Sequence, residues 1–210
     1  MIFLWFLLLT SAVSWGLTGF LRRYALARNL IDVPNERSSH STPTPRGGGV
    51  AIVTAFLAAL PLLNRFDLLA NPVCLALWGA GCAVAVTGFL DDHGHIAARW
   101  RLLVHFGAAA WGLYWLGGFP PVSAFGYSLD LGWFGYAFAA VYVVWLLNLY
   151  NFMDGIDGLA GIEAITVCCG GALMVWLVAP DSTAWMLPVL LASAVLGFLV
   201  WNFPPARIFM

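Results

Sequence analysis

Charge is the scarcest property of this sequence, which contains no lysine. Nine arginines and ten acidic residues are the only fully charged side chains among 210 residues, and 62% of the residues are apolar. A soluble domain carries about 25% charged residues, so this composition excludes an ordinary water-soluble protein. The net charge of -1 and the absence of a basic cluster exclude a nucleic-acid-binding surface, which needs concentrated positive charge.

Cysteine is also sparse, and its placement predicts neither a zinc site nor a disulfide framework. The four cysteines lie in apolar stretches without ligand-like spacing, at positions 74, 82, 168 and 169, so we interpret them as packing residues. A cleaved secretion signal is not predicted either, because the first apolar stretch has no basic residue before it and is followed by Arg22 and Arg23. We interpret that stretch as a first membrane helix.

Long uncharged intervals separate the few charges. Seven of them contain 17 residues or more: 1–21, 47–64, 68–90, 102–129, 131–153, 164–180 and 182–206. A helix needs about 20 apolar residues to cross about 30 Å of hydrocarbon. The sequence therefore predicts an all-α fold, a polytopic helical membrane protein with about seven transmembrane helices in a single integral membrane domain over residues 1–210.

The arginines predict the orientation of these helices. The connectors after the first, third, fifth and seventh intervals hold eight of the nine arginines, and the opposite connectors hold only Arg65. Because positive residues concentrate on the cytoplasmic side of a membrane, we expect the N-terminus outside and the C-terminus in the cytoplasm. The predicted cytoplasmic loops cover about residues 22–48, 91–101, 151–161 and 204–210.

Most acidic residues fall on the same predicted cytoplasmic face. They are Asp32, Glu36, Asp91, Asp92, Asp154, Asp157 and Glu163, whereas each short outer loop holds one acid. Carboxylates near a membrane are costly unless they are paired, hydrated or metal-bound, so this gathering indicates a functional site. A proton- or ion-coupled transporter also uses such acids, but it would place them near the centres of several helices.

The longest polar segment, residues 32–49, contains three prolines and ends in three successive glycines. Glycines at the start of a helix leave N–H groups exposed beside the positive end of the helix dipole, which suits phosphate. A flexible connector between two membrane helices would also account for the segment. Its candidate substrate-binding residues are Arg37, His40, Arg46, Gly47 and Gly48.

Two adjacent carboxylates, Asp91 and Asp92, follow the third uncharged interval. Neighbouring helical side chains point about 100° apart, so both can reach one small site only at a helix end. Paired oxygen ligands suit Mg²⁺, which also binds water and substrate phosphates. The alternative is a hydrated, acidic helix end.

Four polar residues recur at every third position near the end of the fifth interval: Asn148, Asn151, Asp154 and Asp157. Each adjacent pair shares a helical face, although the row drifts about 60° per step. Four such groups would be costly if they were merely buried without partners. We interpret the row as functional, and a structural polar cluster between helices is the alternative.

At these segments the sequence resembles the polyprenyl-phosphate N-acetylhexosamine-1-phosphate transferase family, of the glycosyltransferase family 4 type. Members are integral membrane enzymes that start bacterial polysaccharide and cell-wall assembly. The resemblance rests on four segments in the family's order, DVPNERSSHSTPTPRGGG, GFLDD, NLYNFMDGIDGLAG and NFPPARIFM. The first segment is similar to the branch that initiates O-antigen and lipopolysaccharide synthesis, not to the branch that transfers the muramoyl pentapeptide.

The resemblance implies a reaction on the cytoplasmic face of the bacterial inner membrane. Undecaprenyl phosphate attacks the sugar-linked phosphorus of a UDP-N-acetylamino sugar and yields a lipid-diphosphate sugar and UMP. The implied partners are these two substrates and the lipid bilayer, without nucleic acid, and a homodimer is left open. The implied cofactor is Mg²⁺ or Mn²⁺, with Asn148 and Asn151 binding substrate and with these catalytic or metal-handling carboxylates: Asp91, Asp92, Asp154 and Asp157.

Family members continue beyond the position of Met210. Their next motif contains Gly-Asp and contributes the main metal-ligating aspartate. We therefore expect this chain to be the N-terminal portion of a longer family fold. A membrane fragment without activity of its own is the alternative, because its metal site would be incomplete.

Overall fold

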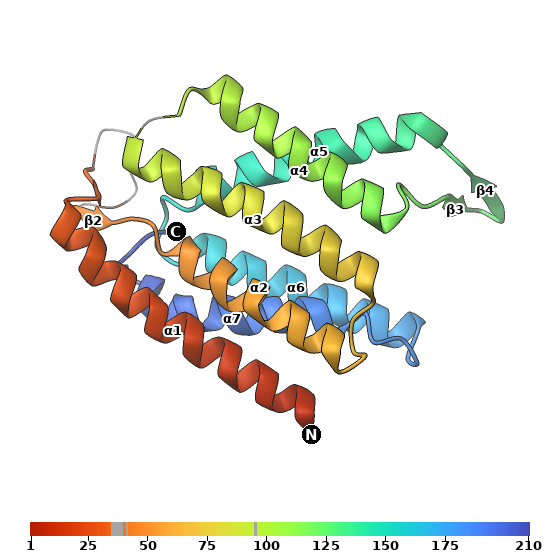
Figure 1. The fold of residues 1–210 in the computed structure, drawn as a ribbon, viewed down its shortest axis with the longest axis horizontal. Helices are drawn as coiled ribbons and strands as arrows, with labels where there is room; N and C mark the ends of the chain where they lie inside the picture. Colours follow the sequence, from red (N-terminus) through yellow and green to blue (C-terminus); the bar gives the residue numbers. More distant parts are fainter. Residues whose placement is uncertain (35–39, 41, 95) are drawn as a thin grey trace. The chain divides into compact units, whose positions relative to one another are not determined.

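The computed structural model describes residues 1–34, 40, 42–94 and 96–210 (Figure 1). This part of the chain forms seven helices: α1 (Ile2–Arg28), α2 (Gly49–Arg65), α3 (Asn71–Gly94), α4 (Ala98–Leu116), α5 (Gly132–Met153), α6 (Leu159–Val178) and α7 (Met186–Asn202). Two short antiparallel strand pairs complete it: β1 (Ile31–Asp32) with β2 (Thr44–Pro45), and β3 (Val122–Ala124) with β4 (Tyr127–Leu129). The predicted all-α membrane fold is confirmed.

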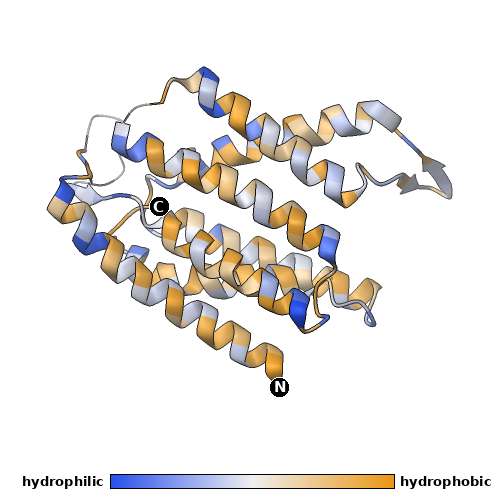
Figure 2. Ribbon diagram, in the orientation of Figure 1, coloured by the Kyte–Doolittle hydropathy of each residue, from blue (hydrophilic) through white to orange (hydrophobic). Residues whose placement is uncertain are grey.

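Among the described residues, four helices are long and apolar enough to cross a membrane, namely α1, α3, α5 and α6. The apolar helices α2 and α7 contain 17 residues each, and α4 carries Arg99 and Arg101 in its first turn. Figure 2 shows apolar residues along most of each helix and polar residues mainly near helix ends. The predicted number of helices is therefore correct, while four of the seven meet the requirements of a span by length and composition.

Several helices extend beyond the uncharged intervals. Because α1 continues through Arg28 and α3 through Gly94, the predicted loops starting at residues 22 and 91 begin too early. α6 starts at Leu159, before the predicted residue 164. A charged residue indicates where the hydrocarbon layer ends, but a helix ends only where its backbone hydrogen bonds end. A helix can therefore continue past a charged residue, because a long polar side chain reaches the membrane interface from within the helix.

The uncharged interval 102–129 is wrong as a single span. Helix α4 ends at Leu116, and Gly117 follows in the left-handed region with a φ of 79°. The β3–β4 hairpin occupies the rest of the interval. The absence of charge does not distinguish an apolar helix from an apolar hairpin, and here a glycine ends the helix.

The chain forms two compact units. Unit 1 contains residues 1–69 and 151–210, and unit 2 contains residues 70–150. In unit 1, α7 packs against α1, α2 and α6. One buried hydrophobic cluster of this unit contains Ile52, Ala194, Val195, Phe198 and Ile208. Since Ile208 follows α7, the end of the chain folds back into the core.

Helices α1 and α7 approach each other through small residues. Thr10, Ser14 and Thr18, which are spaced by four, are buried on α1. A Cβ atom at Gly197 of α7 would lie 2.2 Å from the carbonyl oxygen of Ser11, so this contact requires glycine. Small residues allow such close packing in membrane proteins, where lipid is as apolar as the helix surface.

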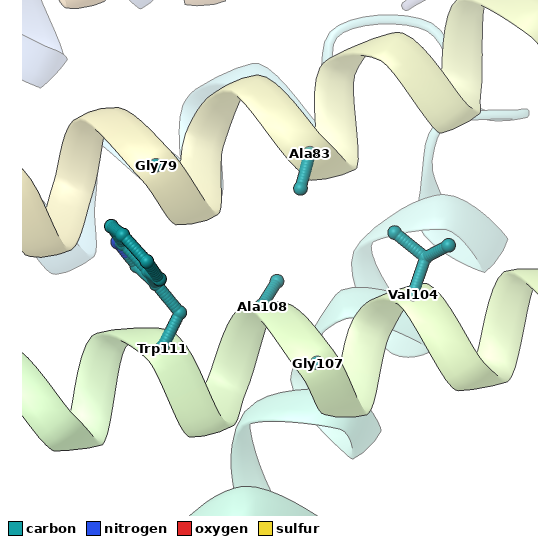
Figure 3. A pocket seen from close by; sticks show the side chains of 6 residues that line it. All are labelled: Gly79, Ala83, Val104, Gly107, Ala108 and Trp111. Atoms are coloured by element: carbon teal, nitrogen blue, oxygen red, sulfur yellow. The ribbon is translucent and has the colours of Figure 1, made fainter.

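In unit 2, α3 and α4 lie side by side (Figure 1). The indole N–H of Trp111 on α4 donates to the carbonyl oxygen of Leu75 on α3 at 2.8 Å. An apolar groove of about 370 Å³ adjoins this contact, and Figure 3 shows its lining residues: Gly79, Ala83, Val104, Gly107, Ala108 and Trp111. The lining offers no group for acid–base or metal chemistry, so the polar segments hold the candidate site.

Candidate active site

Three segments meet at one end of unit 1. They are the described part of the connection between α1 and α2 (residues 29–34, 40 and 42–48), the turn 154–158 before α6, and residues 203–210 after α7. Hydrogen bonds from the last segment join the other two. All three belong to loops that the arginine bias assigns to one side, so their meeting agrees with that assignment. Which side of the membrane they occupy stays a prediction.

The two aspartates of the third motif lie in a turn and not on a helix. Helix α5 ends at Met153, and α6 begins after Gly158, which has a φ of 71°. The expectation of one helical row from Asn148 to Asp157 is therefore wrong in its second half. The row is interrupted where α5 ends at Met153, and Gly158, which reaches its left-handed conformation without the steric cost of a side chain, precedes α6. We call residues 154–158 the acid turn.

Both carboxylates of the acid turn bind backbone N–H groups of the segment after α7. Asp157 accepts from Ala206 through Oδ2 at 2.9 Å, and Asp154 accepts from Met210 through Oδ1 at 3.1 Å. Both side chains are partly buried. A charged acceptor makes a stronger bond than a neutral one, so these bonds fix the acid turn against residues 206–210.

A buried amide supports the same arrangement. Asn202, the last residue of α7, accepts from the N–H of Gly158 at 3.0 Å and donates to the carbonyl oxygen of Ile208 at 2.9 Å. Asn202 belongs to the NFPPARIFM segment, and no role was predicted for it. Its signal in the sequence is a lone amide near the end of an apolar interval, two positions before Pro204, which Pro205 follows.

The glycines of residues 47–49 stand at the start of α2, as predicted, but they contact the end of the chain. Gly47 and Gly48 donate their N–H groups to the carbonyl oxygens of Met210 and Phe209, at 3.2 and 2.8 Å. Phe209 in turn donates to the carbonyl oxygen of Pro45 at 2.8 Å. The expectation that these two N–H groups face a phosphate is thus not met in this structure, because the carbonyl oxygens of Met210 and Phe209 accept them.

The polar side chains of this segment form a small ionic group. Asp32 lies opposite Thr44 in the β1–β2 pair, and one of its carboxylate oxygens forms an ion pair with Arg46. The other carboxylate oxygen lies 3.5 Å from Nε2 of His40. The His40 side chain is 5% exposed and lies edge-on to the ring of Phe209, and neither ring nitrogen makes a hydrogen bond to the residues that the structure describes. The 3.5 Å contact with Asp32 is within ion-pair range but lacks hydrogen-bond geometry. The group thus joins the segment to residue 209.

Arg37, the remaining candidate of this segment, lies outside the described residues. The prediction that it binds substrate stays a prediction, as do those for His40 and Arg46.

The first acidic pair, Asp91 and Asp92, belongs to unit 2 and lies in the last turn of α3. Asp91 accepts from the N–H of Ile96 at 2.8 Å and pairs with Arg101 Nη1 at 2.5 Å. Asp91 therefore organises the connection from α3 to α4. Asp92 is half-buried beside it in the last turn of the helix.

The two asparagines of the third motif lie on α5, as the helical spacing predicted. Asn148 donates to the carbonyl oxygen of Val144 in the preceding turn at 2.8 Å, and Asn151 is exposed in the last turn. Asn148 belongs to unit 2 and Asn151 to unit 1. Their predicted contact with substrate stays a prediction.

The acid turn has the donor chemistry for Mg²⁺, the cofactor implied by the resemblance. Across the part of the chain that the structure describes, no three His, Cys, Asp or Glu side chains form a group that could hold a metal ion. Mg²⁺ in phosphate-transfer sites, however, takes only one or two carboxylates and completes its shell with water and substrate phosphates. Asp154 and Asp157, held on one turn by backbone bonds, fit that partial ligand set.

Comparison with known proteins identifies the family. The model of glycosyl transferase family 4 matches residues 74–210. A probable undecaprenyl-phosphate N-acetylglucosaminyl 1-phosphate transferase of Bacillus subtilis is 28% identical over 206 residues, which cover 92% of this chain and 54% of that protein. A phospho-N-acetylmuramoyl-pentapeptide-transferase of Kosmotoga olearia is 28% identical over 224 residues, which cover 100% of this chain and 68% of that protein.

A second phospho-N-acetylmuramoyl-pentapeptide-transferase, from Synechococcus elongatus, is 32% identical over 222 residues, which cover 96% of this chain and 58% of that protein. Similarity thus extends to both kinds of transferase. The chain spans about half the length of the Bacillus subtilis relative. Because the family match includes the first acidic pair, the acid turn and the segment after α7, and covers more than half of the sequence, the chain belongs to glycosyl transferase family 4.

Proposed function

We propose that this protein transfers an N-acetylamino-sugar 1-phosphate from a UDP-sugar to undecaprenyl phosphate. The products are the lipid-diphosphate sugar and UMP, and the reaction starts the synthesis of O-antigen or a related cell-envelope polysaccharide. The names of the Bacillus subtilis and Kosmotoga olearia relatives support the lipid and amino-sugar chemistry. The arginine distribution supports a cytoplasmic active face in a bacterial inner membrane.

One observation carries the proposal. The acid turn, the glycine segment before α2 and the segment after α7 are far apart in the sequence but interlock at one end of unit 1. Each of these segments carries part of the family resemblance. A helical membrane protein that gathers them at helix ends can bring a water-soluble nucleotide sugar to a lipid whose tail stays in the bilayer.

The reaction depends mainly on positioning the phosphate groups and offsetting their negative charge. An oxygen of the lipid phosphate bonds to the sugar-linked phosphorus, the bond from that phosphorus to the bridging oxygen breaks, and UMP departs with the bridging oxygen. Three phosphate groups approach one another, so positioning and the offset of negative charge dominate the barrier. Bound Mg²⁺, held by Asp154 and Asp157, would supply positive charge that draws the phosphate oxygens together.

We also propose different roles for the two residues of the first acidic pair. Asp91 binds the N–H of Ile96 and the guanidinium of Arg101, so we assign it to holding the α3–α4 connection. We assign the substrate-facing role of the pair to Asp92. This assignment separates a residue whose loss weakens the fold from one whose loss stops transfer.

The test is release of UMP by membranes that contain the full natural polypeptide carrying these residues. The membranes receive undecaprenyl phosphate, Mg²⁺ and, in separate reactions, UDP-N-acetylglucosamine or UDP-N-acetylmuramoyl pentapeptide. We expect release with the first donor and loss of release with EDTA. We also expect Asp157→Asn to lower the rate about 100-fold or more, as removal of one charged group at a transition state does.

The matched control is Asp181→Asn, the same substitution in an exposed turn between α6 and α7. It should keep the wild-type rate. Release only with the pentapeptide donor would overturn the sugar assignment. Absence of UMP with both donors would overturn the proposed activity.

A further inference from the structure

Asn202 holds a position that the proposed chemistry does not itself explain. The residue is 1% exposed, and its amide faces two segments at once. Its carbonyl oxygen accepts from Gly158, the neighbour of Asp157, and its nitrogen donates to Ile208, which is completely buried. Ile208 lies between Ala206 and Met210, whose N–H groups bind the two carboxylates of the acid turn.

We propose that Asn202 is a positioning residue for the transfer reaction, acting by fixing the acid turn against residues 206–210. The inference rests on the proposed function for its kinetic part only. The carboxylates contact the outer N–H groups of residues 206–210, while Asn202 binds the middle of that segment and the end of the acid turn. Removing it frees the two partners to move, and the carboxylates move with them.

After loss of Asn202, a shift of the acid turn costs less free energy than leaving its former backbone partners buried without hydrogen bonds. Without Asn202, the N–H of Gly158 at the start of α6 and the buried carbonyl of Ile208 would both lose their partner. Each unsatisfied buried group costs about 1–3 kcal/mol. A turn built around Gly158 can relieve that cost by shifting its backbone, and such a shift displaces Asp157, the adjacent residue.

Only an amide of this length meets both demands. Leucine has a similar volume but neither donates nor accepts. Glutamine adds a methylene to a site without spare volume, and overpacking a core is itself destabilising. A carboxyl group accepts from Gly158 in either state, but it donates to Ile208 only when it is protonated.

The experiment compares Asn202→Leu and Asn202→Asp with wild type in the full natural polypeptide. Hydrogen exchange of the Gly158 amide and of residues 206–210 measures the position of the turn, and steady-state rates with UDP-N-acetylglucosamine and undecaprenyl phosphate measure transfer. For Asn202→Leu we expect faster exchange at both places. We also expect kcat to fall about 10- to 100-fold, the usual effect of losing a residue that orients a metal ligand, with KM for both substrates changed less than threefold.

The matched control is Asn64→Leu. Asn64 also donates from a partly buried amide to a backbone carbonyl, that of Leu69 at 2.8 Å, but at the other end of α2. Its loss should cost stability without lowering kcat. Asn202→Asp serves as the second variant if leucine prevents folding, and its kcat relative to wild type should rise as the pH falls and the carboxyl group regains its proton.

The outcomes are distinct. A kcat for Asn202→Leu equal to that of Asn64→Leu, or a loss confined to KM, overturns the positioning role. Unchanged exchange at Gly158 overturns it as well. If wild type releases no UMP, the proposed function fails, and faster exchange in Asn202→Leu alone still supports Asn202 as the residue that holds the acid turn.

Discussion

Gly48→Ala tests the contact between the start of α2 and the segment after α7. The Cβ atom of alanine would lie 2.5 Å from Cε2 of Phe198 and 2.9 Å from the carbonyl oxygen of Phe209. Carbon atoms in contact prefer about 3.5–4.0 Å, so the first neighbour must retreat by about 1 Å. Phe198 is 0% exposed and Phe209 is 3% exposed, so neither can retreat without disturbing the core.

Backbone strain contributes nothing to this substitution, because Gly48 has an ordinary φ of -66°. The expected loss is therefore the cost of overpacking, about 1–3 kcal/mol in the free energy of unfolding. Equilibrium unfolding in mild detergent measures that loss, and hydrogen exchange of residues 206–210 locates it. Gly88→Ala on α3 is the control, since no atom lies within 4 Å of its added Cβ.

Alanine at position 88 should leave stability unchanged or raise it by about 0.5–1 kcal/mol, the usual gain over glycine inside a helix. Equal unfolding free energies for the Gly48→Ala protein and wild type, with unchanged exchange after α7, would refute the tight contact between α2 and the end of the chain.

Three further predictions concern other contacts. Gly197→Ala should separate α1 from α7 and lower the melting temperature more than Gly48→Ala does, because its Cβ would lie 2.2 Å from a backbone oxygen; equal melting temperatures would contradict this packing. A double-mutant cycle on Asp32 and Arg46 should give a coupling of about 0.5–1 kcal/mol that shrinks with added salt, since both side chains are partly exposed; a coupling of zero at low salt would contradict the pair. Asp91→Asn should lower the melting temperature and Asp92→Asn should abolish UMP release; an unchanged melting temperature in the first variant together with retained UMP release in the second would contradict their assigned roles.

The helices were predictable because their signal is local. Uncharged intervals overlap all seven described helices, of which four are long and apolar enough to cross a membrane. Their ends were less predictable, as α3 shows: Asp91 and Asp92 end the uncharged interval, yet the helix continues to Gly94. A partly buried aspartate at the last turn finds partners in the following connection, which the helix pattern does not show.

The candidate site was predictable as a list of residues but not as an arrangement. Spacing placed Asp154 and Asp157 on one helical face, whereas α5 ends at Met153 and both acids lie in the turn before Gly158 and α6. Asp154 and Asp157 were found because acids are rare in this chain. Asn202 was missed because a single amide after an apolar interval has no periodic pattern.

The sequence by itself determined that the protein lies in a membrane, how many helices it has and to which family its motifs point. It could do so because apolar runs and short motifs are properties of neighbouring residues. Only the tertiary structure decided what those motifs touch. The N–H groups of Gly47 and Gly48 bind carbonyl oxygens near the end of the chain, and the carboxylates of the acid turn bind N–H groups of the same segment. These partners are distant along the chain, and they meet because packing around α7 buries Ile208 and leaves the polar groups beside it to satisfy one another.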